Sequence, residues 1–209
     1  MTKRQLIDLV RELLSGGDAP AEIRGKYHPK VVAKYLEMAF DDIIAIVAEE
    51  GKKTGDYSLL DKFALPYSQP VSYNSDREQK YCELPVLVMP LPDNSAVRSI
   101  SPPKDQSTQF AYVAVSSQPV WGALDVDSID PVAGYSIEND IVYFDDKFPY
   151  GLENVLLKLV PSFGALDWDD KIGVPAGKNE MLFTKVFTLM QQKKANPQDY
   201  YDDGNNKQV

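Results

Sequence analysis

The side chains that most often perform catalysis or bind metals are scarce in this chain of 209 residues. It contains one histidine, His28, and one cysteine, Cys82. A catalytic pair of nucleophile and histidine would depend on His28, and neither an intrachain disulfide nor a zinc site built from cysteines can form. The Gly-rich motifs that bind nucleotide phosphates do not occur either. These observations predict a protein that is not an enzyme and that uses no cofactor and no metal.

His28 and Cys82 each have a simpler interpretation than chemistry. His28 precedes Pro29 at an expected helix start, and no partner motif accompanies it, so we expect it to pack or hydrogen-bond locally rather than act as a ligand or a pH-sensitive group. A reactive thiolate needs electropositive surroundings, whereas Cys82 is followed by Glu83. We therefore expect Cys82 to be a small buried hydrophobic residue.

Two acidic groups could ligate Ca²⁺ or Mg²⁺ or supply paired carboxylates for hydrolysis. Neither has the central glycine and the glutamate at the twelfth position that a calcium-binding loop requires. In a chain of net charge −9, acidic turns on a solvated surface are the simpler interpretation. The two groups are Asp125, Asp127 and Asp130, and Asp167, Asp169 and Asp170.

The negative charge is concentrated after the first quarter of the chain. Residues 1–55 hold nine basic and nine acidic side chains, so the rest of the chain carries the whole net charge of −9. An acidic body repels phosphate backbones, which predicts no specific binding of nucleic acid but is compatible with DNA sliding past. No apolar run reaches the roughly 18 residues of a membrane span, and the first residues lack the apolar segment of a signal peptide. We expect synthesis in a cytoplasm and no membrane contact.

Two helices are predicted near the N-terminus. Thr2 is a plausible N-cap of the first, whose apolar face has Ile7 at its edge, and Ser15-Gly16-Gly17 would end it. Pro29 suits the first turn of the second, and Gly51 would stop it, which leaves residues 51–55 as a loop. The short connection favours an antiparallel pair. The predicted apolar faces are Leu6, Val10, Leu13 and Leu14 in the first helix, and Val32, Tyr35, Leu36, Ala39, Phe40, Ile43 and Val47 in the second.

Short β-type segments come next, bounded by Pro, Asn, Asp and Ser. A hairpin turn is expected at residues 138–140, where Asn139 suits a positive φ. Strands joined by turns rather than helices predict a central antiparallel sandwich or barrel in an α+β fold. The expected strands are 81–91, which Pro85 and Pro90 place at an edge or split, 97–100, 110–115, 134–137, 141–144 and 155–160.

The helical period returns from Pro175, and after Ala195 the chain is polar. Tyr200 and Tyr201 have nothing local to pack on in this tail, and tyrosine is enriched at interfaces, so the tail is predicted to bind a partner. The alternative is a tail that is simply solvated. Four segments result: a helical part at 1–55, a β domain at 56–172, a C-terminal helix at 173–195 and the tail at 196–209. The helix stripe is Met181, Leu182, Val186, Leu189 and Met190, and the predicted partner-binding residues are Pro197, Gln198, Asp199, Tyr200 and Tyr201.

Four motifs, taken in order, resemble the head-to-tail ring or adaptor proteins of crAss-like and related Bacteroidetes phages. They are the LL-x-GG loop at 13–17, HPKVV at 28–32, LPVLVMPLP at 84–92 and NPQD-x-x-DDG-x-N at 196–206. The resemblance spans nearly the whole chain and implies a structural role in a virion, without catalysis. It further implies a homo-oligomeric ring of twelve copies between the portal and the tail, in contact with other tail or ring proteins, with DNA passing through its lumen.

Two other classes of function stay open at this point. One is a stand-alone binding module, in which a β domain binds carbohydrate or a host factor and the helices form a stalk. The other is a hydrolase that uses the Asp groups for acid catalysis. Rings seen by electron microscopy, a small particle that retains ligand, and turnover of substrate would distinguish the three.

Overall fold

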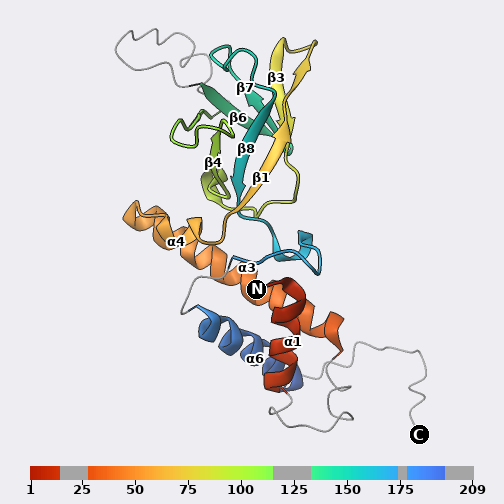
Figure 1. The fold of residues 1–209 in the computed structure, drawn as a ribbon. Coiled ribbons are helices and arrows are strands. Elements are labelled where there is room, and N and C mark those ends of the chain that lie inside the picture. Colours follow the sequence, from red (N-terminus) through yellow and green to blue (C-terminus); the bar gives the residue numbers. More distant parts are fainter. Residues whose placement is uncertain (15–27, 115–132, 174–177, 196–209) are drawn as a thin grey trace, which may run out of the picture.

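The computed structural model describes residues 1–14, 28–114, 133–173 and 178–195, and helices gather at one end of the molecule while strands gather at the other (Figure 1). The predicted α+β fold is confirmed. The helices are α1 (Lys3–Leu14), α3 (Pro29–Thr54), α4 (Ser58–Asp61) and α6 (Asn179–Ala195), with short 3-10 turns η1 (Pro92–Asn94) and η3 (Phe163–Ala165). The strands are β1 (Leu65–Pro70), β2 (Ser72–Asn74), β3 (Gln79–Glu83), β4 (Val97–Ser101), β5 (Ala111–Tyr112), β6 (Gly134–Glu138), β7 (Ile141–Phe144) and β8 (Asn154–Leu159).

The helical part is organised around α3, against which both α1 and α6 pack. Thr2 caps α1 reciprocally with Gln5: the Thr2 hydroxyl accepts the Gln5 N–H at 3.3 Å, and the Gln5 side chain accepts the Thr2 N–H at 2.9 Å. The predicted face of α3 is confirmed, since all its members are buried except the partly buried Tyr35. In α1 the prediction for Leu13 was wrong. Leu13 is 46% exposed, and Ile7, which was placed at the edge, is fully buried.

The end of α3 was also predicted wrongly. Gly51 lies inside the helix, which continues to Thr54 and ends at Gly55 with a left-handed φ of 73°. The Gly55 N–H donates to the Gly51 carbonyl at 2.8 Å and closes the last turn. Gly51 permits a close approach instead, because a Cβ there would lie 2.6 Å from Cδ1 of Tyr57.

The β part consists of two sheets that share one core. The strand orders are β1-β8-β4 and β2-β3-β7-β6-β5, and every pairing is antiparallel except that of β5 with β6. Val155 and Leu157 of β8 are fully buried and share a cluster with Cys82, Val142 and Phe144 of the other sheet. The sheets therefore pack face to face as a sandwich, and the described strands do not close into a barrel.

The predicted hairpin is confirmed: β6 and β7 pair through a turn in which Asn139 and Asp140 have φ of 48° and 64°. The expected strand at 81–91 is only partly present, because β3 ends at Glu83 and prolines interrupt the remainder of the segment. β1 was not predicted, since its segment contains Pro66 and Pro70. The N–H of Val71 donates to the Glu153 carbonyl, on the side of β8. Because successive N–H groups of a strand point to opposite sides, the nitrogens of Pro66 and Pro70 point away from β8. β1 is an edge strand, so no neighbouring strand requires a donor on that side.

Packing crosses the predicted segment limits. Leu60 and Phe63, at and after α4, and Val160 and Phe163, which come after β8, belong to the core of the helical part. All described strands lie between residues 65 and 159. The chain segments that come before and after the strands in the sequence therefore complete the helical core. Through these segments the β part is connected to the helical part.

Candidate functional site

The residues singled out from the sequence do not form one site. His28 lies at the start of α3 in the helical part, whereas Cys82 lies in β3 of the β part (Figure 1). Asp125, Asp127 and Asp130, and the predicted partner-binding residues of the tail, fall outside the described residues. The acidic group at 167–170 lies within them and adjoins the N-terminus of α1.

His28 and Cys82 have the structural roles predicted for them. The Nδ1 atom of His28 accepts the Lys30 N–H at 3.3 Å and caps α3. Cys82 is 1% exposed, and burial raises the pKa of its thiol to about 12. The thiol therefore stays protonated near neutral pH, which makes it a poor nucleophile.

The acidic turn at residues 167–170 receives the N-terminus of α1. The Lys3 N–H donates to the Asp170 carbonyl at 3.0 Å, and the Arg4 N–H donates to the Trp168 carbonyl at 2.8 Å. Asp169 forms an exposed ion pair with Arg4 at 3.2 Å. The first N–H groups of a helix have no partner within the helix, and carboxylates near them are favourable. The turn thus supplies acceptors and charge to α1.

Lys3 connects the same helix to the chain that leaves the β part. Its ammonium donates to the carbonyls of Phe163 at 2.9 Å and of Leu166 at 2.6 Å, and it lies 4.9 Å from the centre of the Phe163 ring. Lys3 is 8% exposed, and burial lowers its pKa, although Glu37, Asp167 and Asp170 oppose the shift. A charged donor placed on two carbonyls fixes the turn η3 against α1.

Asp41 and Glu37 of α3 lie against the other side of η3. The Asp41 carboxylate accepts the Phe163 N–H at 3.5 Å, and burial raises the pKa of Asp41. Gly164 approaches α3 so closely that a Cβ there would lie 2.9 Å from Oε1 of Glu37. We call Lys3, Glu37, Asp41 and residues 163–166 the joint, because they bind the helical part to the end of β8.

Two ion pairs support the joint from further along the chain. Lys52 near the end of α3 pairs with Asp93 of η1 at 2.9 Å. Arg98 of β4 pairs with Asp61 of α4 at 2.6 Å, and its guanidinium lies 4.9 Å from the centre of the Tyr57 ring. Both pairs connect helices to the β part, so the two parts are in contact at several separate points.

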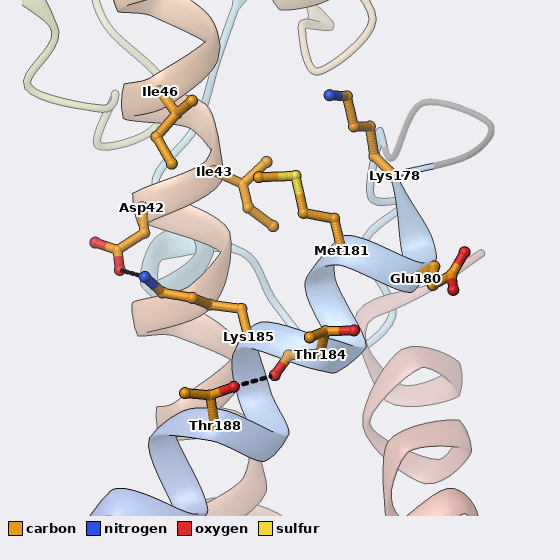
Figure 2. A pocket seen from close by; sticks show the side chains of 9 residues that line it. All are labelled: Asp42, Ile43, Ile46, Lys178, Glu180, Met181, Thr184, Lys185 and Thr188. Atoms are coloured by element: carbon orange, nitrogen blue, oxygen red, sulfur yellow. Dashed lines mark hydrogen bonds and ion pairs between the residues drawn. The ribbon is translucent and has the colours of Figure 1, made fainter.

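A groove runs between α3 and α6 on the helical part (Figure 2). Its volume is about 690 Å³. Lys185 of α6 pairs with Asp42 of α3 at 3.0 Å, and Met181 of α6 extends toward Ile43 of α3. Since residue numbers rise along one helix and fall along the other, α3 and α6 are antiparallel. The groove is lined by Asp42, Ile43, Ile46, Lys178, Glu180, Met181, Thr184, Lys185 and Thr188.

The groove presents apolar surface between charged residues. Ile43 is buried at 3% exposure, whereas Ile46 is 43% and Met181 is 38% exposed. The Thr188 hydroxyl donates to the Thr184 carbonyl at 2.9 Å and so is turned to its own helix. The described residues that line the groove include no histidine and no cysteine. Such a mixture of apolar surface and flanking charges is of the kind that accommodates an apolar side chain.

Only part of this groove was foreseeable from the sequence. Met181 was placed on the apolar stripe of the C-terminal helix together with Leu182 and Val186, which are buried as predicted. The exposure of Met181 was not predicted, and neither was the pairing of Asp42 with Lys185, because the crossing of two distant helices cannot be read from local periodicity.

A smaller apolar crevice lies in the β part. The LPVLVMPLP segment and the turn between β6 and β7 enclose about 310 Å³, with Leu84, Val88, Met89 and Ile137 among the lining residues. Leu87 at its margin is 62% exposed. The crevice has the same apolar character as the groove but less volume.

Comparison with known proteins adds no assignment: no family model matches the chain, and a search of curated proteins finds no match. Within the described ranges, no helix is long and apolar enough to cross a membrane. The same residues contain no group of three or more His, Cys, Asp or Glu side chains that could hold a metal ion.

Proposed function

We propose that this chain is a structural protein of a virion that forms a homo-oligomeric ring between the portal and the tail, through which DNA passes. The order of its four sequence motifs, which resembles that of phage ring proteins, supports this proposal. The observation that carries it is the open α3–α6 groove on a helical part that is joined to the β part by hydrogen bonds and ion pairs.

A ring subunit must contact neighbours through two different faces, because heterologous contacts that close produce rings. The groove provides one partly apolar face on the helical part, with Ile46 and Met181 exposed. The joint would then carry the β part in a constant orientation around the ring. Opposite ends of a subunit would meet different neighbours, the portal on one side and tail or further ring proteins on the other.

Passage of DNA fits the charge of the chain. The residues beyond position 55 carry the whole net charge of −9. A lumen lined with carboxylates would release few counterions on contact with phosphates, so DNA would slide without binding specifically. Free DNA should accordingly give no shift in a gel at moderate ionic strength.

Mass photometry and negative-stain imaging of the purified full chain test the proposal directly. Closed rings, alone or after addition of a portal protein, are the expected result, and twelve copies is the expected number. A particle that stays monomeric at high concentration and with the portal would contradict the ring and favour the stand-alone binding module.

The tail is proposed to bind the portal or an adjacent subunit. Deletion of residues 196–209 should leave the melting temperature nearly unchanged while weakening capture by the portal in a pull-down. If the deletion unfolds the protein, the tail belongs to its core. If capture is unchanged, Tyr200 and Tyr201 are not the anchors proposed here.

A further inference from the structure

The outer edge of α1 is a second apolar surface on the helical part. Leu9 and Leu13 are one helical turn apart, so they lie on the same side of α1, and they are 37% and 46% exposed. The adjacent face of α1, with Leu6, Ile7 and Val10, is buried in the subunit's own core at no more than 1% exposure. Because this buried face fixes the helix, Leu9 and Leu13 point outward.

The apolar residues of the groove and those at the edge of α1 do not cover each other within one subunit. Both remain exposed in the same molecule, at Ile46 and Met181 in the groove and at Leu9 and Leu13 on α1. α1 is also held at its first turn by the joint, through Lys3. A second copy can bring the two surfaces together without moving either helix.

Charge at the two surfaces is complementary. Lys178 and Glu180 both line the groove, and the Glu180 side chain points away from α3 (Figure 2). Glu12 is exposed next to Leu13 on α1. Among the residues that the structure describes, neither Lys178 nor Glu12 forms an ion pair. An ammonium and a carboxylate beside matching apolar patches favour one orientation of contact.

We infer that the α3–α6 groove receives the edge of α1 from a second copy of this chain, with Leu9 and Leu13 against Ile46 and Met181, and Glu12 against Lys178. This inference rests on the proposed function, since it names the contact between neighbours in the ring. The two surfaces are different patches of one subunit, so the contact is heterologous and can repeat around a ring.

A charge exchange tests the pairing in the full chain. Lys178→Glu and Glu12→Lys should each weaken self-association, on the order of tenfold, because each places like charges together. The double variant restores opposite charges and should recover most of the loss. Lys104→Glu makes the same change of charge at an exposed position of the β part, so it is the matched control and should leave association unchanged.

Disulfide trapping tests the direction of the contact. Cys82→Ala removes the only native cysteine, and Leu13→Cys and Met181→Cys are then introduced in separate chains. A mixture of the two chains should give a cross-linked pair under mild oxidation, whereas either chain alone should not. Tyr150→Cys, at a fully exposed residue of the β part, replaces Met181→Cys in the control mixture and should not cross-link with Leu13→Cys.

The outcomes separate this inference from the proposed function. Oligomers that form without the cross-link and without recovery in the double variant would overturn the groove contact while leaving the ring in place. A chain that remains monomeric under every condition would overturn both. Thermal melts of all variants verify folding, and since Glu12 and Leu13 are exposed, their melts should match the parent.

Discussion

The joint and the groove are built on the same stretch of α3, and they differ in how their polar groups are covered. Asp41 faces the joint, where it accepts a backbone N–H and where Lys3 is buried on two carbonyls. Asp42, the next residue, faces the groove, where its ion pair with Lys185 is 39–54% exposed and Ile46 lies open. The joint therefore has the features of a permanent internal contact, whereas the groove leaves its polar pair and Ile46 partly exposed to solvent.

The largest effect is expected at the aromatic centre beside the joint. Phe40 is 3% exposed, and its ring lies 5.7 Å from that of Phe63 and 5.2 Å from that of Phe163. Phe40→Ala should lower the free energy of unfolding by about 3–5 kcal/mol, because it removes this packing and leaves a cavity. Met38→Ala on the exposed side of the same helix is the control, with an expected change within about 0.5 kcal/mol.

Urea unfolding measures both variants. If Phe40→Ala and Met38→Ala had equal free energies of unfolding, α3 would not pack against η3 through Phe40. The joint would then not differ from the exposed side of α3 in how tightly it is packed.

A smaller effect is expected from the polar contacts of the joint. Lys3→Met keeps most of the apolar stem but leaves the carbonyls of Phe163 and Leu166 without their donor. The expected loss is about 1–3 kcal/mol, the usual penalty for a buried group without a hydrogen bond. Arg4→Met removes the neighbouring exposed ion pair with Asp169 and should cost at most about 1 kcal/mol. A thermal melt in which Arg4→Met is the more damaging change would contradict the role assigned to Lys3.

These contacts show where prediction from the sequence succeeds and where it stops. The buried face of α3, the local hydrogen bond of His28 at the helix start and the hairpin at Asn139 result from periodicity and local geometry, and all three are confirmed. The joint could not be predicted, because Lys3 and Leu166 are 163 positions apart and a lysine near a terminus is ordinarily exposed. The only local sequence signal for the groove was the apolar character of Met181. The other features of the groove depend on how α6 packs against α3.

Titration of Asp41 gives the joint a dependence on pH. Burial raises the pKa of this carboxyl, against the hydrogen bond from Phe163. Between the ordinary aspartate value near 3.9 and the raised pKa, the folded state binds more protons than the unfolded state, so this group's contribution to stability falls as the pH rises. Asp41→Asn keeps an oxygen acceptor but has no charge. The variant should therefore gain stability relative to the parent as the pH rises through this window.

Urea unfolding of parent and Asp41→Asn at a series of acidic to neutral pH values measures this difference. A difference that stays constant over the series, or that shrinks toward neutral pH, would show that the carboxylate is well solvated and that the joint is more open than its contacts indicate.

The smallest effect on folding is expected in the groove, where stability and association should respond separately. Ile46 is 43% exposed, so Ile46→Ser removes little packing and should change the free energy of unfolding by no more than about 0.5 kcal/mol. Association between copies should fall all the same, because the lost side chain belongs to the proposed contact.

Ile43→Ser is the matched control, since Ile43 lines the same groove but is 3% exposed. This change should lower the free energy of unfolding by several kcal/mol. Urea unfolding and mass photometry of the two variants separate folding from association. If Ile46→Ser destabilised the chain as much as Ile43→Ser, the groove would be part of the core. If it altered neither property, the surface left open between α3 and α6 would have no part in assembly.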